Sequence, residues 1–109
     1  MERREQPRKR VNRSMVIRDL SREVVLGQLV DICAGGLMIL GAEPLAVGGI
    51  YRLGLDLSEV LEPGAVAEFG AESLWQESLQ SPDKHWTGFR IIAIALDSAA
   101  LVERLTEAL

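Results

Sequence analysis

The chain has 109 residues, of which 48% are apolar, 26% charged and 5% aromatic. These proportions are those of a soluble globular protein, and the length suits one domain with a single core. Its single cysteine, Cys33, excludes an internal disulfide framework and a multi-cysteine zinc site. The longest apolar run, residues 91–96, is far shorter than the roughly 20 residues that span a bilayer. Residues 1–22 are charged and carry no secretory signal, so we expect a cytoplasmic protein without membrane insertion.

Charge is divided unevenly along a chain whose net charge is −4. Residues 1–22 hold eight of the twelve basic residues and carry +5, whereas residues 23–109 carry −9. Seven of those eight are arginines, whose planar guanidinium groups suit phosphates and the Hoogsteen edge of guanine. Residues 1–13 contain Pro7 and no periodic apolar pattern, which predicts a flexible arginine-rich arm. Such an arm either binds an anion or is a solvated tail that improves solubility.

Six short apolar segments, separated by Gly and Pro, predict strands after the arm. We expect these strands at residues 14–20, 24–33, 37–40, 50–57, 65–76 and 86–94. In the second strand, alternation places four side chains on one face: Val24, Leu26, Val30 and Ile32. In the fourth strand it does the same for Tyr51, Leu53, Leu55 and Leu57. The turn between the last two strands is predicted at Ser81-Pro82-Asp83.

Beyond residue 96 the apolar period becomes helical, which predicts a helix over residues 97–109. Asp97 is expected to cap its N-terminus. Its apolar stripe, which must dock on the sheet, is Leu101, Leu105, Ala108 and Leu109. Six strands followed by one helix indicate an all-β fold, a small antiparallel barrel with the helix packed on an opening or side. Residues 14–109 would then form a single barrel domain.

Catalytic chemistry has little support in the sequence. His85 is the only histidine, and no cysteine or serine pairs with it in a recognisable arrangement. The acidic residues are scattered, and one histidine with one cysteine can hardly supply a metal site. Gly35-Gly36 lacks the Lys-Ser/Thr that follows in a phosphate loop. We therefore predict a protein that is not an enzyme and has no metal or cofactor.

Two motifs stand out against this background. Arg4 and Arg8 form an RxxxR in the arm, and Asp31, Cys33 and Gly36 form a DxCxxG at the end of the second strand. Asp31 and Cys33 share a strand face, which looks outward if the opposite face fills the core. Gly36 allows a sharp turn or the close approach of a ligand to the backbone. The simpler alternative is a tight hairpin without a ligand.

In this order, RxxxR and DxCxxG resemble the signature of the PilZ domain family, whose pattern has serine at the position of Cys33. Trp75, followed by a long hairpin and Gly88-Phe89, is similar to the end of the family's barrel. The resemblance covers essentially the whole chain. It implies a six-stranded antiparallel β-barrel with a C-terminal α-helix, and a receptor for the bacterial second messenger cyclic di-GMP.

The resemblance also implies roles for individual residues. Arg4 and Arg8 would grip the nucleotide, with Arg3 as a helper, because guanidinium groups bind guanine edges and phosphates and stack on bases. Asp31 would accept hydrogen bonds from guanine or orient an arginine. Gly36 would let the strand turn pass close under the ligand, and the arm would fold over the nucleotide as a flap.

Cys33 departs from the family pattern, because a thiol is larger and a weaker hydrogen-bonding group than a hydroxyl. If the serine hydroxyl holds the nucleotide directly, its loss costs about 0.5–1.5 kcal/mol, or roughly 2- to 12-fold in affinity. Trp75 either stacks on a base or fills the barrel.

The leading interpretation is a cyclic di-GMP receptor that signals through an unidentified protein partner once the ligand orders the arm. One alternative is a PilZ-like adaptor that works by protein contact and does not bind the nucleotide. Another is a nucleic-acid binder that uses the arm. The charge of −9 on residues 23–109 would repel a long polyanion, so we expect no specific nucleic-acid partner.

Overall fold

A computed structural model describes residues 9–11, 13–80 and 83–109 of the chain. Arg3, Arg4 and Arg8 of the arm, and Ser81 and Pro82 of the predicted hairpin turn, lie outside the described residues. The described residues form the following elements: β1 (Lys9–Arg10), β2 (Val16–Asp19), β3 (Val24–Cys33), β4 (Gly36–Gly41), β5 (Ile50–Asp56), β6 (Val66–Ser78), β7 (His85–Ile94) and α1 (Leu96–Ala108).

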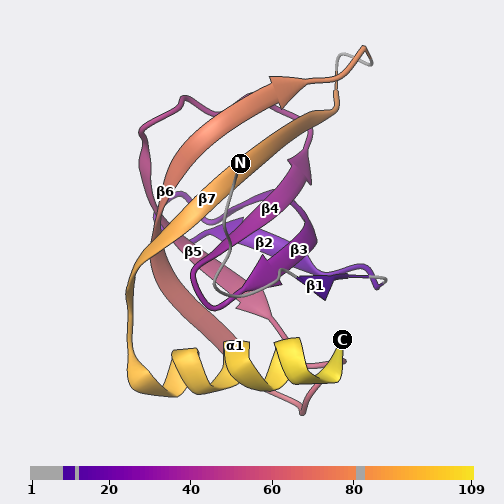
Figure 1. The fold of residues 1–109 in the computed structure, drawn as a ribbon, viewed down its shortest axis with the longest axis vertical. Coiled ribbons are helices and arrows are strands. Elements are labelled where there is room, and N and C mark those ends of the chain that lie inside the picture. Colours follow the sequence, from indigo (N-terminus) through magenta and orange to yellow (C-terminus); the bar gives the residue numbers. More distant parts are fainter. Residues whose placement is uncertain (1–8, 12, 81–82) are drawn as a thin grey trace, which may run out of the picture.

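The strands β2 to β7 close into a barrel. Each strand pairs antiparallel with its neighbours in the order β3-β2-β5-β6-β7-β4, and pairing of β3 with β4 closes the ring. The helix α1 lies across the end of the barrel opposite the β6–β7 hairpin (Figure 1). The prediction of a six-stranded antiparallel barrel with a C-terminal helix is therefore confirmed. The short strand β1, from the segment predicted as an arm, is an addition to the barrel and pairs with β3.

The core fills the barrel with aliphatic side chains from alternate positions of each strand. Leu53, Leu55 and Leu57 are fully buried, as their alternation predicted. Tyr51, on the same face, meets Phe89 edge-on, with ring centroids 5.8 Å apart. With so few aromatic residues, the core depends on close packing of branched side chains, which contribute to stability through the apolar area they bury.

The predicted alternation of β3 is right for Leu26 and Ile32 but wrong for Val24 and Val30. Leu26, Leu29 and Ile32 are buried, whereas Val24 is 41% exposed and Val30 is only partly buried. The pairing of β3 with β4 shifts register between Leu29 and Asp31. Such a bulge adds one residue to β3 and so reverses which side chains point inward.

The helix begins one residue earlier than predicted, and its predicted cap is wrong. Ala95 is the N-cap and makes no side-chain hydrogen bond. Asp97 lies in the first turn, where its Oδ1 accepts a hydrogen bond from the backbone N–H of Ser98 at 2.8 Å. The hydroxyl of Ser98 in turn accepts a hydrogen bond from the backbone N–H of Glu68 in β6, at 3.0 Å.

This contact with β6 fixes which face of α1 packs on the barrel. Ser98, Val102 and Leu105 are buried, and Leu101 and Leu109 pack against the core from its margin. Ala108, which was predicted in the docking stripe, is exposed. The docked residues follow the spacing of four and three that one helix face requires.

Candidate functional site

The strand β1 lies along the end of β3 that carries the DxCxxG motif. Lys9 is paired with Ile32, and Arg10 with Asp31. The backbone N–H of Val11 donates to the carbonyl oxygen of Val30 at 2.9 Å. Because β2 pairs with β3 only from Val24 to Gln28, the edge beyond that point is available to β1. The described end of the arm thus reaches the motif through backbone hydrogen bonds (Figure 1).

Asp31 and Cys33 lie on the outer face of the barrel. Ile32, between them, is fully buried, and both Asp31 and Cys33 are partly exposed. Asp31 lies between Arg10 of β1 and Met38 of β4, and Cys33 ends β3 opposite Gly36. The sequence predicted this outward orientation. It holds because the irregularity between Leu29 and Asp31 returns β3 to the phase in which Leu26 and Ile32 both point inward.

The close approach that Gly36 allows is that of its own strand, β4, to β7. A Cβ atom at this position would lie 2.5 Å from the carbonyl oxygen of Phe89. Gly36 begins β4 and is paired with Arg90, so any side chain here would push the two strands apart. The glycine is therefore required by strand packing, which is a reason separate from the approach of a ligand.

A row of residues continues from Asp31 across the outer face. We define the first row by its successive register pairs: Arg10, Asp31, Met38, Gly88 and Trp75. Directly opposite residues of antiparallel strands project to the same face. A Cβ at Gly88 would overlap Nε1 and Cε2 of Trp75, so the indole covers this glycine. Trp75 is 38% exposed and lies outside the barrel, not in its interior.

A second row runs beside the first. It contains, again by register pairs, Cys33, Gly36, Arg90, Glu72 and Ile50. Nη2 of Arg90 is 2.5 Å from Oε1 of Glu72. The side chain of Arg90 is 59% exposed and that of Glu72 is 28% exposed. Sequence reasoning missed Arg10 and Arg90 as neighbours of the motif, because only the register of four strands brings them there.

His85 begins β7, and its side chain makes contacts within the β6–β7 hairpin. It is buried and is paired with Ser78, whose Oγ is 2.8 Å from its Nδ1. Gln76 approaches the same nitrogen at 3.4 Å. In the part of the chain that the structure describes, no cluster of His, Cys, Asp or Glu side chains is suited to bind a metal. No helix among the described residues has the length and apolar character needed to cross a membrane.

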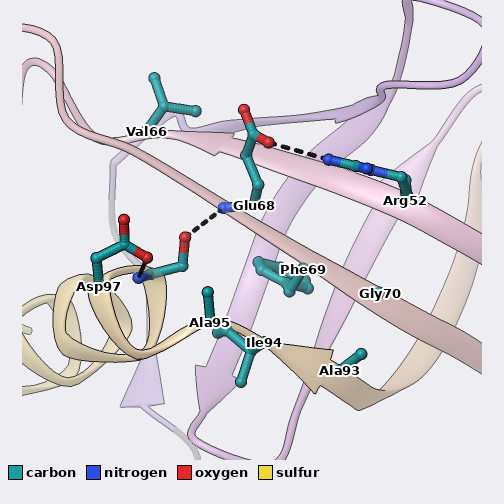
Figure 2. A pocket seen from close by; sticks show the side chains of 10 residues that line it. Arg52, Val66, Glu68, Phe69, Gly70, Ala93, Ile94, Ala95 and Asp97 are labelled. Atoms are coloured by element: carbon teal, nitrogen blue, oxygen red, sulfur yellow. Dashed lines mark hydrogen bonds and ion pairs between the residues drawn. The ribbon is translucent and has the colours of Figure 1, made fainter.

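A hollow of about 850 Å³ lies where β6 and β7 meet the start of α1 (Figure 2). Two small residues, Gly70 and Ala93, line it, and so does the ion pair of Arg52 with Glu68, at 3.2 Å. Asp97 enters from the helix. Of the predicted site residues that the structure describes, none lines this hollow, so it is separate from the motif.

Solved structures with this fold come from several bacterial proteins. The PilZ domain of YcgR from Escherichia coli with c-di-GMP is 17% identical, with a TM-score of 0.74 over 99% of this chain and 92% of that one. MrkH of K. pneumoniae, in complex with c-di-GMP, is 16% identical, with a TM-score of 0.76 over 96% of this chain and 51% of that one.

A third structure is MotI/DgrA, an inhibitor of motility from Bacillus subtilis. It is 19% identical, with a TM-score of 0.74 over 98% of this chain. The chain spans about half the length of both MotI and MrkH. A search of curated protein sequences finds no match to this chain. The sequence model of the PilZ domain matches residues 2–108, and the chain therefore belongs to the PilZ domain family.

Proposed function

We propose that this chain is a receptor for cyclic di-GMP which signals through a protein partner after its arginine arm orders over the nucleotide. The observation that carries the proposal is the pairing of β1 with β3, opposite Asp31 and Ile32. It brings the segment that follows the RxxxR beside the DxCxxG motif. A ligand bound there would meet both motifs at once.

The arm supplies the cationic part of the proposed site. Arg8 directly precedes Lys9, which is paired with Ile32, and Arg3 and Arg4 lie earlier in the same arm. Their guanidinium groups would bind guanine edges and phosphates through charge-assisted hydrogen bonds. Ordering the arm would consume part of the interaction energy. It would also make a new surface that a partner recognises only when the nucleotide is bound.

The outer face of the barrel supplies the other half of the proposed site. Asp31 is partly buried, so its carboxylate would compete less with water for the N1–H and exocyclic amine of guanine. Cys33 and Gly36 would border the ligand at the start of the second row. Trp75, in the first row, presents an exposed indole surface, and aromatic rings of this kind stack on bases.

Two of the related structures support cyclic di-GMP as the ligand. YcgR and MrkH were solved with c-di-GMP, and PilZ domains are ligand-binding or effector domains rather than enzymes. At 16–17% identity the likeness extends to the fold, so the ligand of this chain rests on its own motifs. We propose a non-enzymatic role in the bacterial cytoplasm that needs no other cofactor.

Calorimetric titration of cyclic di-GMP into the whole protein tests the proposal. We expect binding in the micromolar range or tighter, and its loss in the double variant Arg4→Ala/Arg8→Ala. A matched control removes two exposed arginines outside both rows, in Arg52→Ala/Arg104→Ala. The control should bind as the wild type does. Equal loss in both double variants would show that only net charge matters.

Cys33 favours one second candidate, an adaptor that does not bind the nucleotide. It replaces the only hydroxyl of the family's DxSxxG pattern with a weaker hydrogen-bonding group. An adaptor would give no heat of binding and no change in melting temperature with cyclic di-GMP, whereas a ligand that binds only the folded state must raise that temperature.

A further inference from the structure

We infer that Arg90 is an additional ligand-binding residue, and that Glu72 holds its guanidinium until a phosphate of the nucleotide takes the place of the carboxylate. This inference rests on the proposed function, because it extends the same site. Arg90 belongs to neither sequence motif, and its position beside them follows from the register of the sheet.

Arg90 projects from the same face as the motif residues. It is paired with Gly36 of β4 and with Glu72 of β6. Its neighbour Phe89 is buried in the core, so the side chain of Arg90 points outward. Cys33 is paired with Gly36 and lies on that outer face too.

The distance from Arg90 to the motif is within the reach of one dinucleotide. Only β4 separates β3 from β7, and neighbouring strands lie about 4.8 Å apart, so the backbones of Cys33 and Arg90 are about 10 Å apart. The residue between them in the row is Gly36, which has no side chain to block the space. A ligand over Cys33 and Asp31 would therefore extend towards the Arg90 guanidinium.

A phosphate could make the same contact with Arg90 that the carboxylate of Glu72 makes. Carboxylate and phosphate oxygens bind a guanidinium in the same way, through paired N–H donors. With Arg90 59% exposed and Glu72 28% exposed, the pair is open to solvent and to a ligand. Exposed ion pairs contribute little to stability, so replacing the Glu72 carboxylate with a phosphate costs little free energy. Because Glu72 is on β6, it holds the guanidinium on the side of Arg90 away from Cys33 until the ligand arrives.

A second cross-strand pair on the same strand provides a matched control. Arg52 of β5 contacts Glu68 of β6 at 3.2 Å, with both side chains more than half exposed. This pair borders the hollow near α1, and neither residue belongs to either row. A general effect of removing a surface ion pair would be the same for both pairs.

The test is a calorimetric titration of cyclic di-GMP into Arg90→Gln, Glu72→Gln, Arg52→Gln and Glu68→Gln, with thermal unfolding of each variant. We expect Arg90→Gln to weaken binding by about tenfold or more, because a charged hydrogen bond is lost. We expect Glu72→Gln to tighten binding by about two- to fivefold, because the competing carboxylate is gone. The two control variants should stay within about twofold of the wild type.

Three results would overturn the inference. Binding by Arg90→Gln within about twofold of the wild type would remove Arg90 from the site, while leaving the receptor proposal intact if Arg4→Ala/Arg8→Ala still loses binding. Weaker binding by Glu72→Gln would overturn the exchange of carboxylate for phosphate. An absence of binding by the wild-type protein would overturn the proposed function and this inference together.

Discussion

The indole ring of Trp75 occupies the space that a side chain on Gly88 would need, so the two residues form a tryptophan-on-glycine contact on the outside of the barrel. The contact joins β6 to β7 in the first row. It keeps the indole over the neighbouring strand, in the direction of Met38 and Asp31.

Gly88→Ala should displace Trp75. The new methyl group would overlap the indole, and overpacking of this kind costs about 1–3 kcal/mol of unfolding free energy. Tryptophan fluorescence in a Trp86→Phe background reports on Trp75 alone, because the chain has only two tryptophans. An unchanged emission spectrum with unchanged stability would contradict the contact.

Gly36→Ala should be far more damaging than Gly35→Ala. At Gly36 the added Cβ would meet the backbone carbonyl oxygen of Phe89 at 2.5 Å. A backbone atom in a closed barrel can move aside only at a substantial cost in free energy. At Gly35 nothing lies within 4 Å, and its φ angle is not in the left-handed region.

Urea unfolding measures the difference between these two glycine variants. We expect Gly36→Ala to lose about 1–3 kcal/mol of stability. We expect Gly35→Ala to stay within about 0.5 kcal/mol of the wild type, or to gain slightly, because alanine restricts the unfolded chain. Equal stability of the two variants would mean that β4 and β7 are less closely packed than the structure indicates.

The strands were largely predictable from the sequence, but their register was not. Apolar segments bounded by Gly and Pro located β3 at its full bounds and β5 to within one residue, although strict alternation held only for β5. The bulge at Leu29 and Asp31 left no local signal. The strand β1 escaped prediction because Lys9 and Arg10 have no apolar pattern, and their pairing depends on the free edge of β3.

The residues of the candidate site were likewise predictable from the sequence only in part. Asp31, Cys33 and Gly36 were found because they are close in sequence and form a motif. Arg90 and Trp75 are separated from that motif by tens of residues, and only pairing through β4 and β7 brings them to the same face. Contacts that depend on long-range register cannot be read from local periodicity.

Asp19 should make stability fall at acidic pH. The residue is only 4% exposed. Burial by itself would raise its pKa, but hydrogen bonds from the side chain and backbone of Arg22 and from the backbone of Ser21 outweigh it and lower the pKa. Nε of Arg22 donates to Oδ2 at 2.9 Å, and the backbone N–H of Ser21 donates to Oδ1 at 3.0 Å.

Because the pKa of Asp19 is lower in the folded state, its ionised form stabilises the fold fully above the unfolded pKa of about 4. That contribution is lost as the pH falls through the folded pKa. We expect Asp19→Asn to be less stable than the wild type by about 1–2 kcal/mol at neutral pH, and the gap to narrow below about pH 4. Urea unfolding across this range measures the gap, and a constant gap would refute the role of ionisation.

Cys33→Ser should bind cyclic di-GMP as tightly as the wild type or more tightly. Cys33 lies partly exposed at the end of β3, opposite Gly36, where its side chain borders the proposed ligand. A hydroxyl is a better donor and acceptor than a thiol, so a direct hydrogen bond would gain roughly 2- to 12-fold in affinity. Cys33→Ala separates hydrogen bonding from size, because it removes the thiol without adding a hydroxyl. A large loss of affinity in Cys33→Ser would mean that the thiol itself is packed against the ligand, since serine differs from cysteine only at that atom.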